Sequence, residues 1–404
     1  MIPIIVRTFQ LITAAGCISS CFYYLFCLWS AHSFSREQNA GTSAHAIESL
    51  PPVSILKPLK GIDPEIYKSF RSHCLQDYPE YEIIFGVSDP NDDAVASVRQ
   101  LQQEFPQRAI RLVVCPEKLG ANVKVGNLEQ MLQTARCEYL LVNDSDIRVE
   151  PDYLRRVIAP LAADAKVQDQ NQEKNKDERV GMVTCLYRGI AAPTLGSRLE
   201  SLGISTDFCA GVLVARQLES GLHFGLGSTL AFRRADLQRA GGFRAIVDFL
   251  ADDYELGRRI SDLGLPVVLS DVVVETHLPA YDLNGFLAHQ IRWARGVRDS
   301  RLGGYIGLAA TFGLLWSLLN LLAAHAASWA WALLAAVLLL RFAVAVKVGR
   351  GVLHDKTLMK NLWLLPLRDL IAVGIWIVSF FGRTVIWRGD RFQLKSGRLS
   401  RIVS

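Results

Sequence analysis

The chain has 404 residues, of which 50% are hydrophobic, and a formal net charge of +5. With a mean hydropathy of +0.20, it is too apolar for an ordinary soluble enzyme of this length. The composition therefore excludes a wholly soluble protein and predicts that part of the chain lies in a bilayer.

The first predicted element is a transmembrane helix. Residues 4–29 are almost all apolar and exceed the roughly 20 residues that a spanning helix needs. A cleaved signal peptide is the alternative, but its apolar region would be shorter and would end in a small-x-small cleavage site. We predict a membrane anchor over residues 1–30 and a polar linker over residues 31–52.

Short apolar and β-branched runs follow the linker, and the first four begin about 29 residues apart. This interval fits one strand and one crossover helix, and right-handed crossovers assemble such strands into a largely parallel sheet. A charged stretch at residues 164–179 is predicted to be a surface loop. The fold class is therefore α/β, with a Rossmann-like nucleotide-binding sheet. The predicted strands are residues 53–56, 82–87, 111–115, 139–142 and 182–186, and the predicted helices lie within 64–76, 92–105 and 122–136.

Acidic side chains follow two of these strands. Ligands of parallel α/β sheets lie beyond the carboxyl ends of the strands, where this chain places Asp89, Asp144 and Asp146. The pair Asp144 and Asp146 suits one hard divalent cation that also takes oxygens from a diphosphate. Asp89 is predicted to hold the base or ribose of a nucleotide. The alternative for each residue is a turn or a helix cap.

Asp252 and Asp253 lie in apolar surroundings where a helix is predicted to begin. A carboxylate in such a place is suited to act as a general base with a raised pKa. The alternative is an acidic pair that only stabilises the N-terminus of the helix through its dipole.

A basic and aromatic element precedes the first C-terminal membrane segment. Its Arg292 and Arg295 are suited to clamp a leaving diphosphate, and Trp293 is suited to cover an acceptor. The alternative is a juxtamembrane basic stretch with an interfacial tryptophan. Residues 195–222 are predicted to form an apolar entry path from the bilayer, with an ordinary core helix as the alternative.

Three more apolar segments follow, at residues 303–325, 328–346 and 362–387. The first two are predicted to form a transmembrane hairpin over residues 302–348. The third contains Arg368 and Asp369, and a basic tail follows it, which the positive-inside rule places in the cytoplasm with the catalytic region. We therefore expect residues 362–381, within a C-terminal region of residues 349–404, to lie in the interface or to re-enter.

Five motifs occur in one order along the chain: KPLKGIDP at residues 57–64, the strand end at Asp89, NDSDIRV at 143–149, ADDY at 251–254, and Arg292 with Trp293. This series resembles the ceramide glucosyltransferase family of GT-A glycosyltransferases. Within that family the chain most resembles the hopanoid-biosynthesis-associated members of bacteria. The runs that carry this second resemblance are LQDYPEYE at 75–82, GANVK at 120–124, VTCLYRG at 183–189 and IRWAR at 291–295.

The resemblance implies a cytosolic GT-A domain over residues 53–301, flanked by helical membrane segments. It makes Asp89 a nucleotide contact, Asp144 with Asp146 the site of Mg²⁺ or Mn²⁺ and diphosphate, and Asp253 the catalytic base. By the same matching, Lys57, Lys124, Gly227 and Ser228 lie near the donor, and Arg292 contacts its phosphates. Residues expected on the acceptor or leaving-group side are Asp252, His289, Arg292, Trp293 and Arg295.

One position departs from the pattern. The family's element reads (Gln/Arg)-x-x-Arg-Trp, and its first position here is His289. A neutral or protonated imidazole can still donate a hydrogen bond to a phosphate oxygen.

The resemblance further implies inverting transfer of N-acetylglucosamine from its UDP form to a hydroxyl group of bacteriohopanetetrol, at the cytoplasmic face of a bacterial inner membrane. The expected partners are the UDP-sugar, the lipid and the bilayer; no nucleic acid is expected, and the oligomeric state stays open. One alternative is transfer of glucose from UDP-glucose to ceramide. Others are a processive or polyprenyl-phosphate glycosyltransferase and a non-catalytic nucleotide-sugar-binding module.

Overall fold

The computed structural model describes residues 2–41, 50–170, 179–387 and 389–402. The chain divides into two compact units, which we call the sheet unit and the helical unit. The sheet unit consists of Gln38–Ile190, Leu218–Pro279 and Phe392–Ser404. The helical unit consists of Met1–Glu37, Ala191–Gln217 and Ala280–Arg391. The chain therefore leaves the sheet unit twice and returns to it twice.

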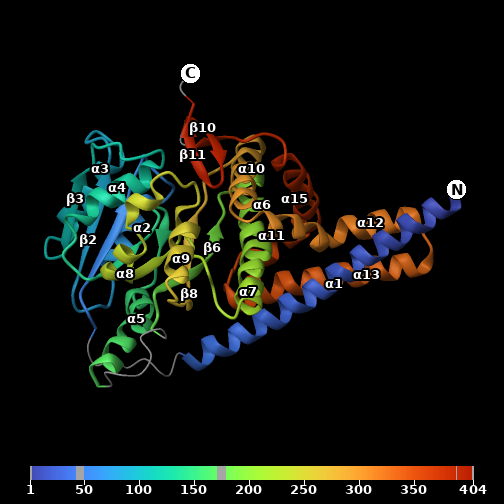
Figure 1. The fold of residues 1–404 in the computed structure, drawn as a ribbon, viewed down its shortest axis with the longest axis horizontal. Helices are drawn as coiled ribbons and strands as arrows, with labels where there is room; N and C mark the ends of the chain where they lie inside the picture. The colour runs from blue at the N-terminus through green and yellow to red at the C-terminus, as the bar shows by residue number, and fades with distance from the viewer. Residues whose placement is uncertain (1, 42–49, 171–178, 388, 403–404) are drawn as a thin grey trace. The chain divides into compact units, whose positions relative to one another are not determined.

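The sheet unit contains an eight-stranded sheet with the strand order β3-β2-β1-β4-β7-β6-β8-β5 (Figure 1). The neighbours among β1 to β4 pair in parallel, as do β6 and β8, whereas β7 pairs antiparallel with β4 and β6. The largely parallel sheet and its five predicted strands are confirmed. The strands are β1 (Val53–Pro58), β2 (Tyr81–Val87), β3 (Ala109–Val114), β4 (Tyr139–Val142), β5 (Ile147–Arg148), β6 (Met182–Ile190), β7 (Leu230–Arg233) and β8 (Val267–His277).

Every residue of β1, β2 and β4 is buried, because helices cover both faces of a parallel sheet. The predicted crossover helices are present, and α4 contacts both β1 and β2. Strands β5, β7 and β8 were not predicted, and β7 and β8 lie on either side of β6 in the sheet. The helices of this unit are α2 (Ile66–Cys74), α3 (Ala94–Glu104), α4 (Val123–Leu132), α5 (Tyr153–Gln170), α8 (Arg234–Arg239), η2 (Phe243–Ile246) and α9 (Asp252–Asp262).

Helix α5 corrects one prediction. It continues to Gln170, so residues 164–170 of the predicted surface loop are helical. Residues 171–178 lie outside the described residues. The chain ends in a hairpin of β10 (Asp390–Lys395) and β11 (Arg398–Arg401), which pair antiparallel.

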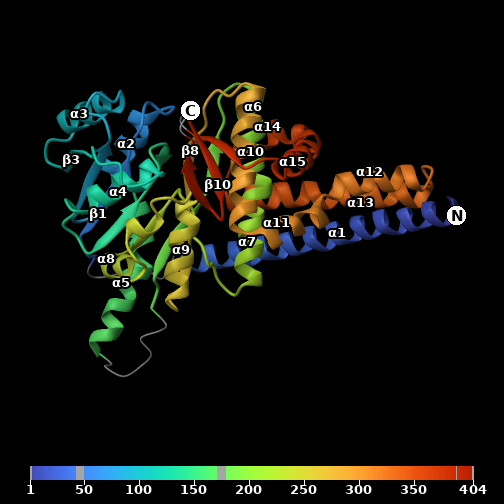
Figure 2. The same ribbon diagram turned by 45° about the horizontal axis from the view of Figure 1, so that its top comes forward.

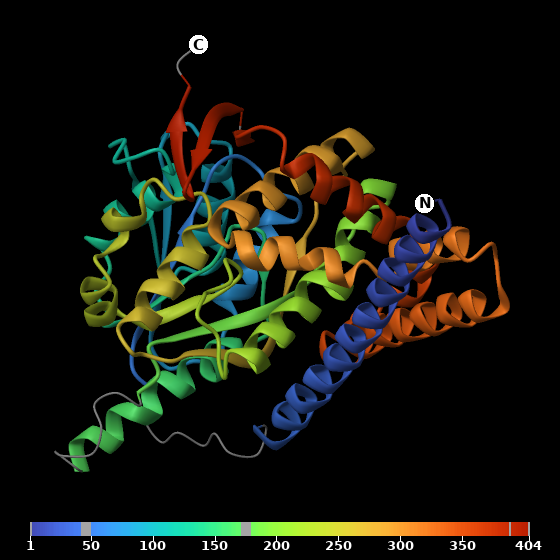
Figure 3. The ribbon, with the colours of Figure 1, turned by 45° about the vertical axis from the view of Figure 1, so that its right-hand side comes forward.

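The helical unit is built around α1 (Ile2–Gly41), which runs alongside α12 and α13 (Figures 1, 2 and 3). Small polar residues join α1 to α12 and to η3 (Leu308–Thr311): Thr13 Oγ1 donates to Asn320 Oδ1 at 3.2 Å, and Ser20 Oγ donates to Ala310 O at 3.0 Å. Such pairs are typical of helix contacts in lipid. The other elements are α6 (Leu195–Gly203), η1 (Ile204–Phe208), α7 (Cys209–Leu218), α10 (Leu283–Ser300), α11 (Leu302–Gly307), η3 (Leu308–Thr311), α12 (Gly313–Ala323), α13 (Ser328–Ala345), η4 (Val346–Val352), α14 (Leu358–Asn361), η5 (Leu362–Leu364), α15 (Leu365–Ser379) and β9 (Thr384–Trp387).

Three helices in the described part of the chain are long and apolar enough to cross a membrane, namely Ile4–Asn39, Ser328–Val352 and Leu358–Ser379. A fourth candidate is the pair Leu302–Thr311 and Gly313–Ala323, which is bent by 49°. The predicted segment at residues 303–325 is therefore not one straight helix. The predicted segment at residues 362–387 ends as a helix at Ser379, and β9 follows.

The anchor helix is longer than predicted. Helix α1 continues to Gly41, so residues 31–41 of the predicted linker are helical, and residues 42–49 lie outside the described residues. The reason is that the buried face of the helix continues through Ala31 and Phe34. The Arg216 guanidinium lies 5.4 Å from the Phe34 ring and also pairs with Glu37.

Candidate functional site

Lys124 is at the centre of the candidate site in the sheet unit. Its Nζ atom lies 2.8 Å from Oδ1 of Asp144 and 3.0 Å from Oδ2 of Asp252. Lys124 lies in the first turn of α4, Asp144 follows β4, and Asp252 begins α9. Burial by itself would lower the pKa of Lys124, but the carboxylates of Asp144, Asp252 and Asp253 raise it above its ordinary value. The lysine therefore stays charged between two carboxylates.

Asp253 is the second residue of α9 and lies beside this cluster. Its Oδ2 accepts a hydrogen bond of 2.7 Å from the N–H of Gly227, and its Oδ1 accepts one of 2.8 Å from the N–H of Tyr254. Burial, followed by the charge of Asp252, raises the pKa of Asp253 to about 6. A carboxyl group with this pKa is suited to accept a proton near neutral pH.

Gly227 allows the loop before β7 to pass close to two acidic side chains. A Cβ atom at this position would lie 3.0 Å from Oδ2 of Asp144 and 3.2 Å from Oδ2 of Asp253. Both contacts are tighter than ordinary van der Waals distances. The predicted donor-site loop therefore lies against the predicted base and the predicted metal ligand.

Asp146 and Lys57 lie behind the same acidic turn. Lys57 is fully buried, and its Nζ donates a hydrogen bond of 2.9 Å to the main-chain oxygen of Asp144. Thr276 Oγ1 donates to Oδ2 of Asp146. Burial lowers the pKa of Lys57 to about 7, against the opposing charges of Asp146 and Asp144. Burial, followed by the charge of Asp144, raises the pKa of Asp146 to about 6. Through its hydrogen bond to Asp144 O, Lys57 thus holds the main chain of the turn.

A buried polar network that the sequence analysis missed supports this turn. Asn143 is fully buried, and its Nδ2 donates to Ser228 O at 2.6 Å and to Tyr153 Oη at 2.9 Å. His73 Nε2 lies 3.2 Å from Asn143 Oδ1, and burial lowers the pKa of His73 to about 3. Asn143 belongs to a recognised motif, whereas no pattern along the chain links it to His73, 70 residues earlier.

Asp89 lies outside the described contacts of this cluster. It follows β2, its side chain is exposed, and its Oδ1 accepts a hydrogen bond of 2.8 Å from the N–H of Asn91. Because β2 and β1 run in parallel register, Asp89 lies at the same sheet edge as the ends of β1 and β4. The structure thus shows the turn contact that the sequence allowed as an alternative, and a nucleotide contact by Asp89 stays a prediction.

The basic and aromatic element lies on α10 of the helical unit. His289 Nδ1 is 2.9 Å from Oε1 of the buried Glu200 on α6. The His289 ring stacks on Tyr281, with centroids 5.4 Å apart, and lies 5.2 Å from the Trp293 ring. The Trp293 ring is in turn 6.0 Å from Phe208. His289 is therefore held by a carboxylate and two aromatic rings, and Glu200 is a partner that the sequence analysis missed.

Arg295 binds main-chain oxygens just after the last candidate membrane span. Its Nη2 donates to Phe381 O at 2.7 Å, and its Nη1 donates to Thr384 O. These bonds hold the chain where α15 ends and β9 begins. The predicted phosphate contacts of Arg292 and Arg295 stay predictions.

The acidic residues fit a divalent cation only if a bound nucleotide supplies further oxygen ligands. The described residues contain no group of three or more His, Cys, Asp or Glu side chains that would hold a metal ion alone. Mg²⁺ in such sites takes one or two carboxylates and completes its shell with substrate phosphates and water. Asp144, whose side chain is 40% exposed, is able to supply such a carboxylate.

Comparison with known proteins places the chain among sugar-transferring enzymes. A family model described as glycosyl transferase family 21 matches residues 12–400. Ceramide glucosyltransferase 3 of Caenorhabditis elegans is 23% identical over 395 residues, which cover 93% of this chain and 80% of the relative. Ceramide glucosyltransferase 1 of the same organism is 22% identical over 408 residues, which cover 96% of this chain and 81% of the relative.

A solved structure shares the fold. A mannosyltransferase from Pyrobaculum calidifontis, in complex with GDP-Man and Mn²⁺, matches with a TM-score of 0.50 and 21% identity, covering 90% of this chain and 99% of that chain. The predicted GT-A-like fold is therefore confirmed.

Proposed function

The chain belongs to glycosyl transferase family 21, and on this premise we propose that it is an inverting enzyme that moves a sugar from a UDP-sugar to a hydroxyl group of a membrane lipid. That it is a glycosyltransferase follows from the family and from the names of its relatives. The observation that supports the mechanism is Asp253, with its raised pKa, beside Gly227 and the Lys124 cluster.

In the proposed reaction, Asp253 removes the proton of the acceptor hydroxyl while that oxygen attacks the anomeric carbon. Lys124 orients Asp144 and Asp252, and Arg292 offsets negative charge on the departing UDP. A divalent cation held by Asp144 and Asp146 would neutralise diphosphate charge when bound. One base and one displacement invert the configuration, so an α-linked donor gives a β-linked product.

We propose N-acetylglucosamine and a hopanoid such as bacteriohopanetetrol as the donor sugar and acceptor, from the motif runs at residues 75–82, 120–124, 183–189 and 291–295. The second candidate is glucose and ceramide, which the names of the curated relatives favour. In either case the enzyme is proposed to lie in a bacterial inner membrane with Asp253 facing the cytoplasm.

The deciding experiment incubates the purified full chain and Mg²⁺ or Mn²⁺ with UDP-N-acetylglucosamine or UDP-glucose, each against bacteriohopanetetrol and ceramide. Mass spectrometry of the lipids identifies the products. A hexosamine on the hopanoid supports the first candidate, and a hexose on ceramide supports the second. No glycosylated lipid in any combination would contradict the proposed function.

The Asp253→Asn variant tests the base. Asparagine keeps the shape and an oxygen that accepts from the N–H of Gly227, so we expect unchanged affinity for the UDP-sugar and a fall in kcat of about 10²- to 10⁴-fold. Asp262→Asn, on the same helix with a side chain that is 61% exposed, is the matched control and should retain activity. Loss of UDP-sugar binding by Asp253→Asn would instead assign this residue to the donor site.

A further inference from the structure

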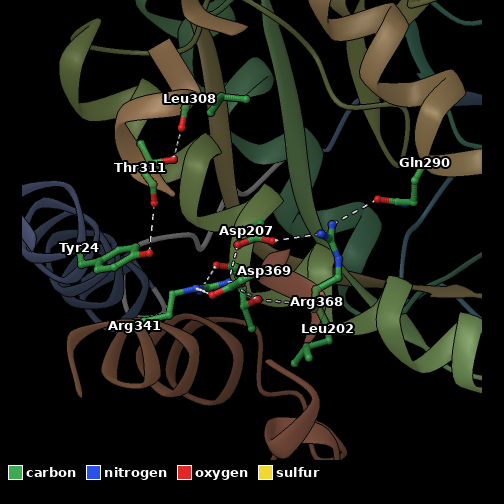
Figure 4. A network of polar contacts seen from close by, with 10 residues as sticks. Tyr24, Leu202, Asp207, Gln290, Leu308, Thr311, Arg341, Arg368 and Asp369 are labelled. Atoms are coloured by element: carbon green, nitrogen blue, oxygen red, sulfur yellow. Dashed lines mark hydrogen bonds and ion pairs between the residues drawn. The ribbon is translucent and has the colours of Figure 1, made fainter. Parts of the chain in front are cut away.

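The helical unit contains a buried cluster of charged side chains (Figure 4). Arg341 on α13 is 3% exposed, and it pairs with Asp369 on α15 at 2.7 Å and with Asp207 on η1 at 2.5 Å. Both α13 and α15 belong to candidate membrane spans. Charged groups are costly to bury on such apolar helices, and they usually mark a functional site.

Arg368 is the fourth charged member of this cluster. It is 7% exposed, its Nη2 donates to Gln290 Oε1 at 3.2 Å, and its Nη1 lies 3.8 Å from Oδ2 of Asp207. Its buried Nε and Nη1 atoms have no hydrogen-bond acceptor among the described residues. A buried donor without an acceptor is unfavourable, so these two N–H groups call for a bound partner.

Gly203 makes room for this guanidinium. A Cβ atom at position 203 would lie 2.6 Å from both Nε and Nη2 of Arg368. Gly203 is the last residue of α6, immediately before the π-helix η1. Single π-turns inserted between α-helices are rare and are frequent at functional sites.

Asp207 gives the cluster an accessible acceptor. Its side chain is 38% exposed, whereas those of Arg341 and Arg368 are almost fully buried. The next residue, Phe208, lies 6.0 Å from Trp293, which neighbours His289. A carboxylate, two unused guanidinium donors and an aromatic surface thus lie close together in a unit with membrane-length helices.

We propose that Asp207 and Arg368 form a subsite for the polar head of the lipid acceptor, and that this head is uncharged and carries hydroxyl or amide groups. The proposal rests on the proposed lipid glycosyltransferase function. A hydroxyl group both donates to a carboxylate and accepts from a guanidinium, so it satisfies both partners. An anionic phosphate fits worse, because Asp207 and Asp369 already balance the charges of Arg341 and Arg368.

Direct lipid binding tests the subsite. The full chain in non-ionic detergent is titrated with short-chain ceramide, bacteriohopanetetrol and, as the anionic probe, short-chain phosphatidic acid. We expect one of the uncharged lipids to bind the wild-type protein more tightly than phosphatidic acid does. Asp207→Asn and Gly203→Ala should each weaken that binding about tenfold, because each disturbs one charge-assisted contact.

A matched variant separates this effect from general damage to the helices. A Cβ atom at Gly374, on α15, has no atom within 4 Å, so Gly374→Ala should bind the lipid like the wild type. Affinity for the UDP-sugar, measured on the same samples, should be unchanged in all three variants and reports whether they are folded. If Asp207→Asn fails to fold, the proposal is still tested by the lipid affinity of Gly203→Ala and by the lipid preference of the wild type.

Unchanged lipid affinity in folded variants, or tighter binding of phosphatidic acid by the wild type, would overturn the subsite. The transferase assay separates the two proposals. Sugar transfer with an acceptor KM that is the same in Gly203→Ala and wild type would contradict the subsite and leave the function standing. Lipid binding that depends on Asp207, without sugar transfer to any lipid, would contradict the function and leave the subsite standing.

Discussion

At the scale of single residues, the proposed reaction depends most on Asp253. Burial and the charge of Asp252 raise the pKa of its carboxyl group to about 6. In the proposed reaction the deprotonated form of Asp253 is the base, so the active fraction is lost as the pH falls through that value. We therefore expect kcat/KM to decline below about pH 6, where an ordinary aspartate near 3.9 would still be ionised. A pH profile that stays flat down to about pH 5 would contradict the raised pKa of Asp253.

A substitution at Gly227 tests how closely the loop packs against the acidic side chains, without changing any charge. In Gly227→Ala the added methyl group would press on Oδ2 of Asp144 and Oδ2 of Asp253. We expect kcat to fall about 10-fold or more, since small displacements of catalytic groups are costly. Gly126→Ala on α4 is the control, because its methyl group would meet Leu119 at an ordinary 3.8 Å. Steady-state kinetics of equal activity in the two variants would contradict the arrangement.

A site residue could be predicted from the sequence only where it lies next to a recognisable strand or helix. Asp144, Asp146 and Asp253 could be found because they lie at the ends of predicted strands or at the start of a predicted helix. His73 and Glu200 could not be predicted, because no motif near either residue marks it. Their partners, Asn143 and His289, are far away in the sequence, and only the fold brings them close. The Asp89 turn contact was foreseen only as an alternative.

At the scale of elements, α4 is the helix that presents Lys124, and Asn122 fixes its start. The Asn122 side chain caps the helix by accepting from the N–H of Val125 at 3.2 Å, and its Nδ2 donates to Phe249 O at 2.8 Å. The cap thus also binds the chain just before α9. Two halves of the site, Lys124 and Asp252, are therefore joined through one asparagine.

Removal of this cap should destabilise the protein measurably. We expect Asn122→Ala to lower the free energy of unfolding by about 1–2 kcal/mol and the Tm by about 2–8 °C. Asn122→Ser keeps a capping oxygen and should recover part of the loss. Thermal-shift measurements compare the three proteins. Equal melting of all three would show that α4 does not depend on its cap.

At the scale of the whole molecule, the C-terminal hairpin from Phe392 onward belongs to the same unit as Asp253. The N–H of Leu250 donates to Gly397 O at 3.0 Å, and the N–H of Leu399 donates to Asp248 O at 2.6 Å. The tail must therefore lie on the same side of a membrane as Asp253. It follows that residues 280–391 cross the membrane an even number of times, so their three candidate spans cannot all cross.

An even number of crossings agrees with the hairpin predicted over residues 302–348 and with a third segment that stays at the interface. We expect Ser400→Cys, an exposed position on β11, to react with a membrane-impermeant maleimide only after the cells are opened. The wild type, in which six of the eight native cysteines are buried, gives the background. Labelling of intact cells would place the tail outside and contradict both the hairpin and the cytoplasmic orientation.

The sequence by itself determined the parallel sheet, the acidic strand ends, the start of α9 and the existence of membrane-length helices, because each depends on local periodicity or composition. It did not determine where α1 and α5 end, since those helices continue beyond the apolar pattern that revealed them. Only the tertiary structure decided that Lys124 lies between Asp144 and Asp252, and that Arg341 lies between Asp207 and Asp369. These partners are brought together by strand order and helix packing, which no pattern along the chain records.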